Sequence, residues 1–238
     1  MTNPLTMKLS SFTALTDHDR ALLDGLVRHP VAMRGARDLI TEGERPERVI
    51  LLLKGWAFRY KVLPDGKRQI MAYLLPGDLC DPHVFILRRM DHSIGLLSDA
   101  EVVTISKEDI LQITEASPAI GRALWWSTMV DEAVLRHWLV NMGQRDAFAR
   151  IAHLFCELWE RAAHVGLVQG GSFDLPLTQE QLGDTMGLTS VHTNRVLQRM
   201  RNEGMIALES KRLTILDMDA MRRAAQFDPD YLHFQRVD

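Results

Sequence analysis

The sequence predicts an α+β fold with an N-terminal antiparallel β-roll (jelly roll), a long helix and a C-terminal winged helix-turn-helix. Three patterns predict it. Short apolar runs broken by turn residues fill residues 31–106, and apolar residues recur at helical spacing over 118–142. Two short capped helices joined by a glycine occupy residues 175–206. The expected domains are residues 1–115, 116–143 and 144–238.

The N-terminal part is expected to begin with an amphipathic helix from Thr16 to Val27, which His29-Pro30 ends. Pro64-Asp65-Gly66 separates two apolar runs and predicts a hairpin turn over Leu63–Lys67. Many short antiparallel strands at this spacing are typical of a jelly roll or barrel. The clearest expected strands are 49–53, 57–62, 69–75 and 101–105.

A short helix is expected to begin at Ser106, and a longer one runs from about Pro118 to Met142. The longer helix carries a narrow apolar stripe that is typical of a coiled-coil partner. The alternative is packing of this stripe against the roll of the same chain. The stripe predicts a dimer interface made by Ile120, Leu124, Asp131, Val134 and Trp138, in which the polar Asp131 would fix the register.

Gly143 is expected to be the hinge between the long helix and the next helix, Arg145–His164. Cys156 lies in the apolar part of that second helix, and a buried free thiol usually behaves as a small hydrophobe. We therefore interpret Cys156 as core filling. With Cys80 as the only other cysteine, the chain offers no disulfide framework, which fits a reducing compartment.

The segment from Leu175 to Ile206 carries start and stop signals for two helices. Thr178 followed by Gln181 predicts a capping box at the first helix. Gly187 is expected to end that helix with a positive φ, and Thr189 to cap the second. This is the plan of a helix-turn-helix that reads DNA.

The second helix sorts its residues by face at about 100° per residue. Val191, Asn194, Arg195 and Gln198 point outward, with Ser190 near the entrance, and Asn and Arg are side chains that can contact base edges bidentately. The alternative is an ordinary amphipathic helix with a solvated face. Thr193, Val196, Leu197 and Met200 form the opposite, buried face.

Two short apolar runs follow, over Met205–Ile215, and predict a β-hairpin or wing. Lys211 and Arg212 lie at its tip, where they can reach the DNA backbone. Asp217 is expected to cap a last helix.

TQEQLGDTMGLTSVHTNRVLQRMRNEGMI, residues 178–206, resembles the winged helix of the Crp/Fnr family of bacterial transcription regulators. GWAFRYKVLPDGKRQIMAYLLPGD, residues 55–78, is similar to the glycine-punctuated β-roll that this family shares with cyclic-nucleotide-binding domains. The resemblance covers nearly the whole chain. It implies a homodimer, joined by the long dimerisation helix, on an inverted-repeat operator with half-sites about 34 Å apart.

The resemblance also implies which residues contact DNA. Ser190, Val191, Asn194 and Arg195 match the base-reading positions. Many relatives carry Glu where this chain has Val191, and the change removes an acceptor for cytosine N4 and introduces a side chain that suits a thymine methyl. The backbone contacts are assigned to Thr178, Gln179, Thr189, His192, Arg199 and Lys211.

Family members that bind cyclic AMP carry a Gly-Glu pair after the PGD-like turn and an Arg-Ser or Arg-Ala pair further on. In this chain Asp81-Pro82 and His92-Ser93 stand near those two positions. The arginine that pairs with the cyclic phosphate is missing, and Arg88 or Arg89 would have to replace it from a different place. The resemblance therefore implies a regulator that does not depend on cyclic AMP, with an unknown effector and no predicted cofactor.

Other sensors and functions stay open. An iron–sulfur cluster needs more cysteine ligands than this chain has. Cys80, His83 and His92 are the residues for a haem or metal sensor, although no metal site is predicted, and a regulator without a ligand is a further alternative. A cupin-like metalloenzyme needs a His-x-His cluster with a carboxylate, which is missing, so no enzyme is expected and no catalytic residue is assigned. A winged helix that contacts proteins instead of DNA would lack salt-dependent duplex binding.

The formal net charge of −3 does not favour a DNA-binding protein, but residues 189–212 hold five Arg or Lys against two Glu. Binding is therefore expected to depend on a small basic face and on salt. No run of about 18 apolar residues and no signal peptide are apparent, so the expectation is a cytoplasmic protein without membrane contact. Its expected partners are double-stranded DNA and a second copy, with RNA polymerase as a further candidate.

Overall fold

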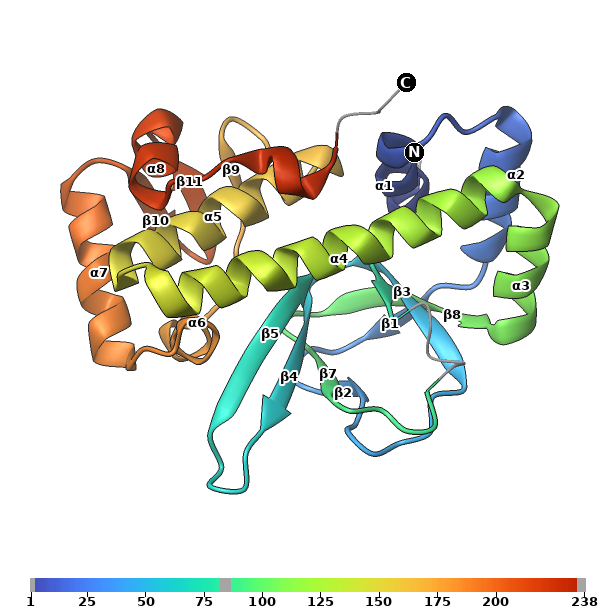
Figure 1. The fold of residues 1–238 in the computed structure, drawn as a ribbon, viewed down its shortest axis with the longest axis horizontal. Coiled ribbons are helices and arrows are strands. Elements are labelled where there is room, and N and C mark those ends of the chain that lie inside the picture. Colours follow the sequence, from blue (N-terminus) through green and yellow to red (C-terminus); the bar gives the residue numbers. More distant parts are fainter. Residues whose placement is uncertain (1–2, 82–86, 235–238) are drawn as a thin grey trace. The chain divides into compact units, whose positions relative to one another are not determined.

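The computed structural model describes residues 3–81 and 87–234. The chain forms two compact units, whose elements are labelled in Figure 1. Residues 63–70 and 133–232 form one of them, which we call the winged unit, and the rest of the described chain forms the roll unit. The long helix α4 (Pro118–Gln144) contributes residues to both.

Two four-stranded sheets form the roll, with strand orders β1-β8-β3-β6 and β2-β7-β4-β5. The four predicted strands are present as β3 (Arg48–Lys54), β4 (Ala57–Val62), β5 (Arg68–Leu74) and β8 (Ala100–Ser106). Strands of two to four residues are too short to show an alternating pattern, and the sequence does not predict them. These are β1 (Val31–Met33), β2 (Asp38–Ile40), β6 (Leu79–Cys80) and β7 (Ser93–Leu96).

The turn between β4 and β5 confirms the predicted hairpin. The backbone N–H of Leu63 donates to the carbonyl of Lys67 at 2.8 Å, and that of Gly66 donates to Leu63 at 2.9 Å. Gly66 has φ 83°, a left-handed conformation that glycine adopts without a steric penalty. The Pro-Asp-Gly sequence therefore determines this turn locally.

Three helices flank the strands of the roll. The predicted first helix is α2 (Asp17–Leu26), and the predicted short helix is α3 (Lys107–Ala116), each with a capping box at its start. The sequence analysis does not predict α1 (Pro4–Phe12). Its signals are nevertheless present, because Asn3 caps it, Pro4 starts it, and Leu5, Leu9 and Phe12 are buried on one face.

The helix α4 continues through Gly143, so the hinge expected at that residue is wrong. The chain leaves the helix at Arg145, and α5 (Ala147–His164) begins behind the N-cap Asp146, whose side chain accepts from the N–H of Ala149 at 2.8 Å. A single glycine costs a helix only about 1 kcal/mol, whereas a good N-cap determines where the next helix starts.

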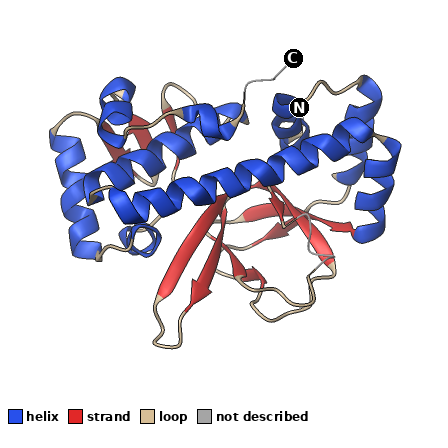
Figure 2. Cartoon of the chain, viewed as in Figure 1, coloured by secondary structure: helices blue, strands red, loops and turns tan. Residues whose placement is uncertain are grey.

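The winged unit is mainly helical, as Figure 2 shows, with a small sheet of strand order β10-β11-β9. Cys156 is fully buried on α5, as the core-filling interpretation expects, and burial raises the pKa of its thiol to about 12. Of the helices in the described ranges, none is both long and apolar enough to cross a membrane. The remaining elements are β9 (Ser172–Asp174), α6 (Gln179–Met186), α7 (Ser190–Asn202), β10 (Ile206–Glu209), β11 (Arg212–Ile215), α8 (Met218–Ala225) and the 3₁₀ helix η2 (Pro229–Leu232).

Candidate nucleic-acid interface

The helices α6 and α7 have the caps that the sequence predicts. The Thr178 hydroxyl accepts from the N–H of Gln181 at 3.1 Å, and the Gln181 side chain accepts from the N–H of Thr178 at 2.9 Å. Gly187 ends α6 with φ 64°, and the Thr189 hydroxyl accepts from the N–H of His192 at 3.2 Å. These local bonds fix the start of both helices and the turn between them.

The two faces of α7 also lie as the periodicity predicts. Thr193, Val196, Leu197 and Met200 are buried. Ser190, Val191 and Arg195 are exposed on the opposite face, and 71% of Val191 is accessible. An accessible valine at the start of such a helix gains nothing from the fold of its own chain, because its apolar surface stays in water. The face therefore offers an apolar contact next to a guanidinium.

Asn194 is placed differently from the other predicted base-reading residues. It is half-buried, and its side-chain amide donates to the Gln179 side-chain oxygen at 2.9 Å, which links α7 to α6. Bidentate binding of adenine requires both the amide N–H and the carbonyl of an asparagine. The bond to Gln179 uses one of the two amide N–H groups and orients the side chain, and it leaves the second N–H and the carbonyl for a base.

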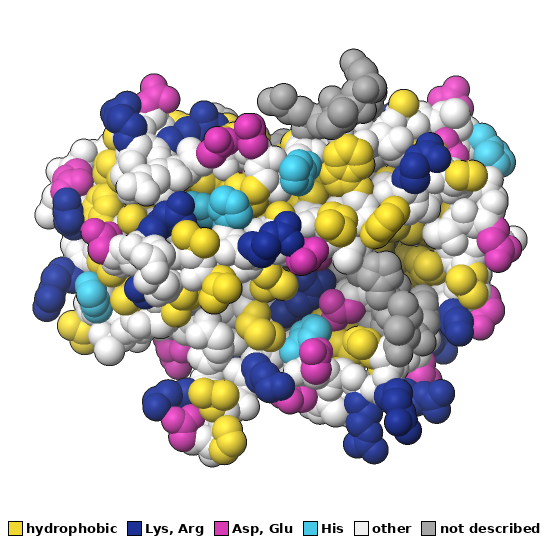
Figure 3. Space-filling model, in the orientation of Figure 1, with side chains coloured by type: hydrophobic (Ala, Val, Ile, Leu, Met, Phe, Trp, Pro, Cys, Tyr) yellow, Lys and Arg dark blue, Asp and Glu magenta, His cyan; other side chains and the backbone are white. Residues whose placement is uncertain are grey.

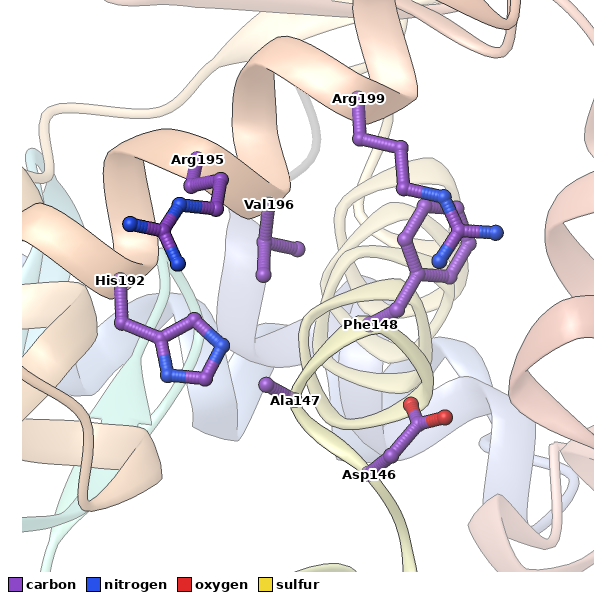
Figure 4. A pocket seen from close by; sticks show the side chains of 7 residues that line it. All are labelled: Asp146, Ala147, Phe148, His192, Arg195, Val196 and Arg199. Atoms are coloured by element: carbon purple, nitrogen blue, oxygen red, sulfur yellow. The ribbon is translucent and has the colours of Figure 1, made fainter.

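A cavity of about 310 Å³ lies between α7 and the start of α5. Figure 4 shows the side chains of His192, Arg195 and Arg199 around it. Arg199 lies 4.3 Å from the centre of the Phe148 ring and 2.7 Å from the carboxylate of Glu203. The predicted backbone contact Arg199 therefore also packs against α5, although it is exposed, as Arg195 is.

The remaining predicted backbone contacts lie at helix starts and in the wing. Thr178 and Thr189 are exposed caps, and Gln179 is half-buried. Lys211 is exposed at the turn between β10 and β11, where it adopts φ 62° and its neighbour Ser210 adopts φ 48°. The wing and its tip lysine are thus present as predicted.

Two residues that support this interface are missed by the sequence analysis. A Cβ at Gly183 would lie 2.5 Å from the carbonyl oxygen of Leu188, so the turn passes too close to α6 for any side chain there. Arg150 of α5 donates to the carbonyls of Met142 and Met186, each at 3.0 Å. Gly183 could have been found as a glycine inside a capped helix, whereas nothing in the local sequence indicates the role of Arg150.

The predicted interface residues of α4 are placed differently from the expectation. Ile120, Leu124, Val134 and Trp138 are all buried within their own chain. The Trp138 ring N–H donates to Glu157 at 2.9 Å, and Asp131 accepts from Arg59 at 3.3 Å. Four of the five are thus covered by their own chain, whereas Asp131 is half-buried, and another face of α4 is more exposed.

That other face carries exposed apolar side chains, and hydrophobic atoms are visible along the course of α4 in Figure 3. Trp125 is 68% exposed and Leu139 is 74% exposed. Trp125, Met129 and Leu139 fall on one series of alternating steps of four and three, which is the spacing of a coiled-coil seam. Glu132, Arg136 and Gly143 occupy the other positions of this series. The exposed apolar set consists of Trp125, Met129, Leu135, Leu139 and Val140.

The interior of the roll contains a cluster of charged side chains, which we call the roll cluster: Arg59, Asp81, His92 and Asp131. Arg59 contacts Asp81 at 3.1 Å and Asp131 at 3.3 Å, and His92 contacts Asp81 at 2.9 Å. Burial disfavours the charge on Arg59, but the two carboxylates raise its pKa. For His92, burial is likewise outweighed by hydrogen bonding and charge from Asp81, so its pKa is also raised.

The candidate metal ligands do not form a site in the described part of the chain. Cys80 is fully buried, and burial raises the pKa of its thiol to about 12, which disfavours the thiolate that a metal binds. His92 contacts the carboxylates of Asp81 and Asp91. Within residues 3–81 and 87–234 no group of three metal-ligating side chains comes together. Pro82 and His83 lie outside the described residues.

Two family models match the chain. A cyclic nucleotide-binding domain matches residues 34–117, and a Crp-like helix-turn-helix domain matches residues 149–224. The chain belongs to the Crp/Fnr family. It is a DNA-binding transcription regulator of this family, with a β-roll followed by a helix-turn-helix, and its relatives are regulators rather than enzymes.

Relatives and solved structures agree with this assignment. The chain is 25% identical over 197 residues to the transcriptional activator protein FnrL of Cereibacter sphaeroides, covering 80% of this chain and 77% of FnrL. It is 24% identical over 195 residues to the nitrogen fixation regulation protein FixK of Azorhizobium caulinodans, covering 82% and 78%. The structure of FixK2 from Bradyrhizobium japonicum superposes with a TM-score of 0.74 at 22% identity, covering 84% of this chain and 98% of that one. The Crp/Fnr fold is therefore shared over most of the length.

Proposed function

We propose that this Crp/Fnr protein acts in the cytoplasm as a homodimer that binds an inverted-repeat operator, with α7 of each subunit in a major groove. The outward face of α7 carries the proposal. Its exposed residues are Ser190, Val191 and Arg195, and its buried face is fully packed. Two-fold symmetry then sets the half-sites one helical turn apart, about 34 Å.

Each base-reading residue has a stated role in this proposal. Arg195 pairs with the O6 and N7 of a guanine, and Val191 contacts a thymine methyl. Ser190 stands at the entrance of the same helix. Asn194 contacts a base through its second amide N–H and its carbonyl, while Gln179 holds the side chain in place. Lys211 neutralises a DNA phosphate, and the hydroxyls of Thr178 and Thr189 form hydrogen bonds to phosphates; these contacts do not select a sequence.

The second copy binds along the exposed face of α4. Trp125, Met129 and Leu139 on this face leave apolar surface in water in a single chain, and their spacing allows two such helices to pack knobs into holes. This interface replaces the buried stripe through Trp138. Asp131 then acts within its own chain, through Arg59, rather than in the interface.

Cyclic AMP is not the effector in this proposal. The guanidinium in the roll cluster, Arg59, already contacts the carboxylates of Asp81 and Asp131, and His92 contacts Asp81 and one more carboxylate, Asp91. A cyclic phosphate that enters this region meets carboxylates of its own charge sign, which repel it. Calorimetry with cyclic AMP and cyclic GMP is expected to show no binding at micromolar concentrations, and a micromolar affinity would contradict the proposal.

An absorbance spectrum and metal analysis of the purified protein test the haem and metal alternatives.

Selection of bound duplexes from a random pool tests operator binding and gives the half-site. On the selected site, Arg195→Ala is expected to cost about 1–3 kcal/mol and to relax one base position. The matched control is Lys211→Ala, which is expected to weaken binding to all sequences alike and to reduce the salt dependence. Equal weakening by Arg195→Ala on all sequences would show that Arg195 contacts only the backbone.

Replacing single thymines of the operator by deoxyuridine tests Val191, because this removes the methyl and nothing else. One thymine per half-site is expected to matter to the wild type by a few-fold, and the same replacement is expected to be neutral for Val191→Ala. If no single thymine matters, the thymine contact is refuted. Val191→Glu is expected to select a G·C pair at this position, because the carboxylate can accept a hydrogen bond from the N4 of cytosine.

Two neighbouring residues of α4 separate the two possible interfaces. Leu139→Glu places a charge on the exposed face and is expected to yield folded monomers in light scattering. Trp138→Glu places a carboxylate beside the buried Glu157 and is expected to destabilise the subunit itself. A folded Leu139→Glu dimer would refute the proposed interface.

A further inference from the structure

The C-terminal segment Phe227–Leu232 lies beyond residue 224, where the match to the family's helix-turn-helix domain ends. It is nevertheless part of the core of the winged unit. Phe227 is 8% exposed, Tyr231 is 9% exposed and Leu232 is fully buried. Residues outside a DNA-reading motif that bury this much surface are held there by contacts with the scaffold of the motif.

Tyr231 contacts two different helices at once. Its hydroxyl donates to the Glu157 carboxylate of α5 at 3.0 Å. Its ring stacks on the His137 ring of α4, with ring centres 3.7 Å apart and planes 13° apart. One side chain of the C-terminal segment therefore connects α4 to α5.

The carboxylate of Glu157 is the centre of these contacts and is fully buried. The Trp138 ring N–H of α4 donates to it at 2.9 Å, and Arg161 of α5 contacts it at 3.3 Å. With Tyr231, all three partners donate, so the arrangement requires Glu157 as an acceptor. We call Trp138, Glu157, Arg161 and Tyr231 the winged cluster.

A second set of contacts reinforces the same junction. The Asn141 amide of α4 lies 3.1 Å from the His153 ring nitrogen of α5, and the Phe227 ring packs edge-on against His153 with ring centres 5.1 Å apart. Arg145, between the helices, donates to the carbonyl of Gln226. The segment is thus fixed to α4, to α5 and to the linker between them.

This junction connects the two functional surfaces of the proposed dimer. The last turns of α4 carry Leu139 and Val140 of the proposed interface, and α5 supports the reading helix through Phe148 and Arg150. Only Arg145 and Asp146 separate α4 from α5. A change in the angle between these helices therefore changes the distance between the two α7 helices of a dimer.

We propose that Phe227–Leu232 is a clamp that fixes the angle between α4 and α5 and so sets the half-site spacing that the dimer accepts. Tyr231 is the positioning residue of this clamp, which rests on the proposed function. It touches no DNA, and it acts by holding Glu157 and His137 together. The clamp predicts that Tyr231 affects the choice of operator spacing and leaves the reading of each half-site intact.

The test measures binding of the full-length protein to four duplexes: the selected operator, an operator with one base pair added at the centre, one with a base pair removed there, and a duplex with a single half-site. Tyr231→Ala is expected to lose about tenfold on the selected operator, the equivalent of one lost hydrogen bond to a buried charge. Affinity for the single half-site is expected to change by less than about twofold. The ratio of the affinity for the selected operator to the affinity for the altered spacings is expected to decrease.

Two further variants keep the test decisive if Tyr231→Ala folds poorly. Tyr231→Phe keeps the ring stacked on His137 and removes only the bond to Glu157. Its affinity ratio between the selected and the altered spacings is therefore expected to lie between those of the wild type and Tyr231→Ala. Tyr60→Phe is the matched control, because it removes a tyrosine hydroxyl bonded to Asp38 in the roll, and it is expected to bind like the wild type.

The proposal is overturned if folded Tyr231→Phe and Tyr231→Ala keep the wild-type preference among spacings, or if they lose half-site and full-site affinity equally. If the wild-type protein binds no inverted repeat, the proposed function itself is wrong. This result is distinct from a failure of the clamp, which appears only in the variants. Hydrogen exchange gives an independent readout: Tyr231→Phe is expected to speed exchange in the last turns of α4 and the first turns of α5.

Discussion

The roll cluster holds half-buried carboxylates and the winged cluster a fully buried one, and the two clusters stabilise them in different ways. In the roll, Asp81 and Asp131 face the guanidinium of Arg59, and the charges balance across β4, the chain after β6, and α4. In the winged unit, Glu157 is held mainly by neutral donors from Trp138 and Tyr231, with one arginine of its own helix.

The histidines beside the two clusters show the same contrast. Hydrogen bonding and charge from Asp81 raise the pKa of His92 against the effect of burial. Burial and the charge of Arg145 lower the pKa of His153 to about 3. The neighbouring carboxylate thus favours the protonated form of His92, whereas burial and a neighbouring guanidinium disfavour the protonated form of His153. The two units should therefore respond differently to loss of a charge and to pH.

Removing the single cation of the roll cluster is expected to have the largest effect. Arg59→Met leaves two carboxylates without their guanidinium and should lower the free energy of unfolding by about 3–5 kcal/mol. The matched control is Lys54→Met, which breaks the exposed pair with Glu101 and should cost less than about 1 kcal/mol. Equal, small losses in denaturant titrations would mean that the roll cluster does not depend on charge balance.

Removing the acceptor of the winged cluster is expected to cost somewhat less. Glu157→Leu leaves the Trp138 ring N–H and the Tyr231 hydroxyl without an acceptor, at a cost of roughly 2–4 kcal/mol. Glu157→Gln keeps a carbonyl acceptor for both donors, and burial already raises the pKa of Glu157, so removing its charge should cost little. A Gln variant as unstable as the Leu variant would show that the charge of Glu157 is what the fold requires.

Near neutral pH the lowered pKa of His153 has a smaller effect on stability, and this effect grows as the pH falls. Because its folded pKa of about 3 lies below the ordinary 6.5, its contribution to stability is present above pH 6.5 and is lost as the pH falls toward 3. The loss amounts to about 1.4 kcal/mol for each pH unit. His153→Gln should flatten this dependence in hydrogen exchange of α5 amides, and an unchanged slope would assign the dependence to other groups.

The smallest expected effect is that of Asp131→Asn. Its carboxylate is partly exposed, and Asp81 remains to neutralise Arg59 at 3.1 Å. The variant should lose about 1 kcal/mol in thermal or denaturant unfolding and should remain a dimer in light scattering. Dissociation into folded monomers would instead place Asp131 in the interface, as the sequence alone predicts.

The winged unit shows what can be predicted from local sequence. Capping residues, a turn glycine and the helical period act within a few residues of one another, so Thr178, Gly187 and the two faces of α7 are predicted correctly. The strands of six or seven residues are predicted for the same reason. Very short strands and α1 are missed, although α1 carries a recognisable cap.

The clusters could not be predicted, because their members meet only in the folded chain. Arg59 and Asp131 are 72 residues apart, and Glu157 and Tyr231 are 74 apart. The helix α4 differs from the clusters, because the sequence leaves open which of its sides a second copy covers. Both of its sides are apolar, one against its own chain and one exposed, and periodicity cannot tell which side a partner covers.

At the tip of the wing, the residues that would give the most stable turn differ from those that suit the proposed DNA contact. Ser210 and Lys211 both adopt positive φ, a conformation for which Asn-Gly is far better suited. A laboratory screen that selects only for heat resistance should therefore replace this pair readily and remove the lysine for which we propose a DNA contact. Heat-resistant descendants of this protein should be recognisable by an Asn-Gly wing and a weakened salt dependence of binding, unless DNA binding is selected in the same screen.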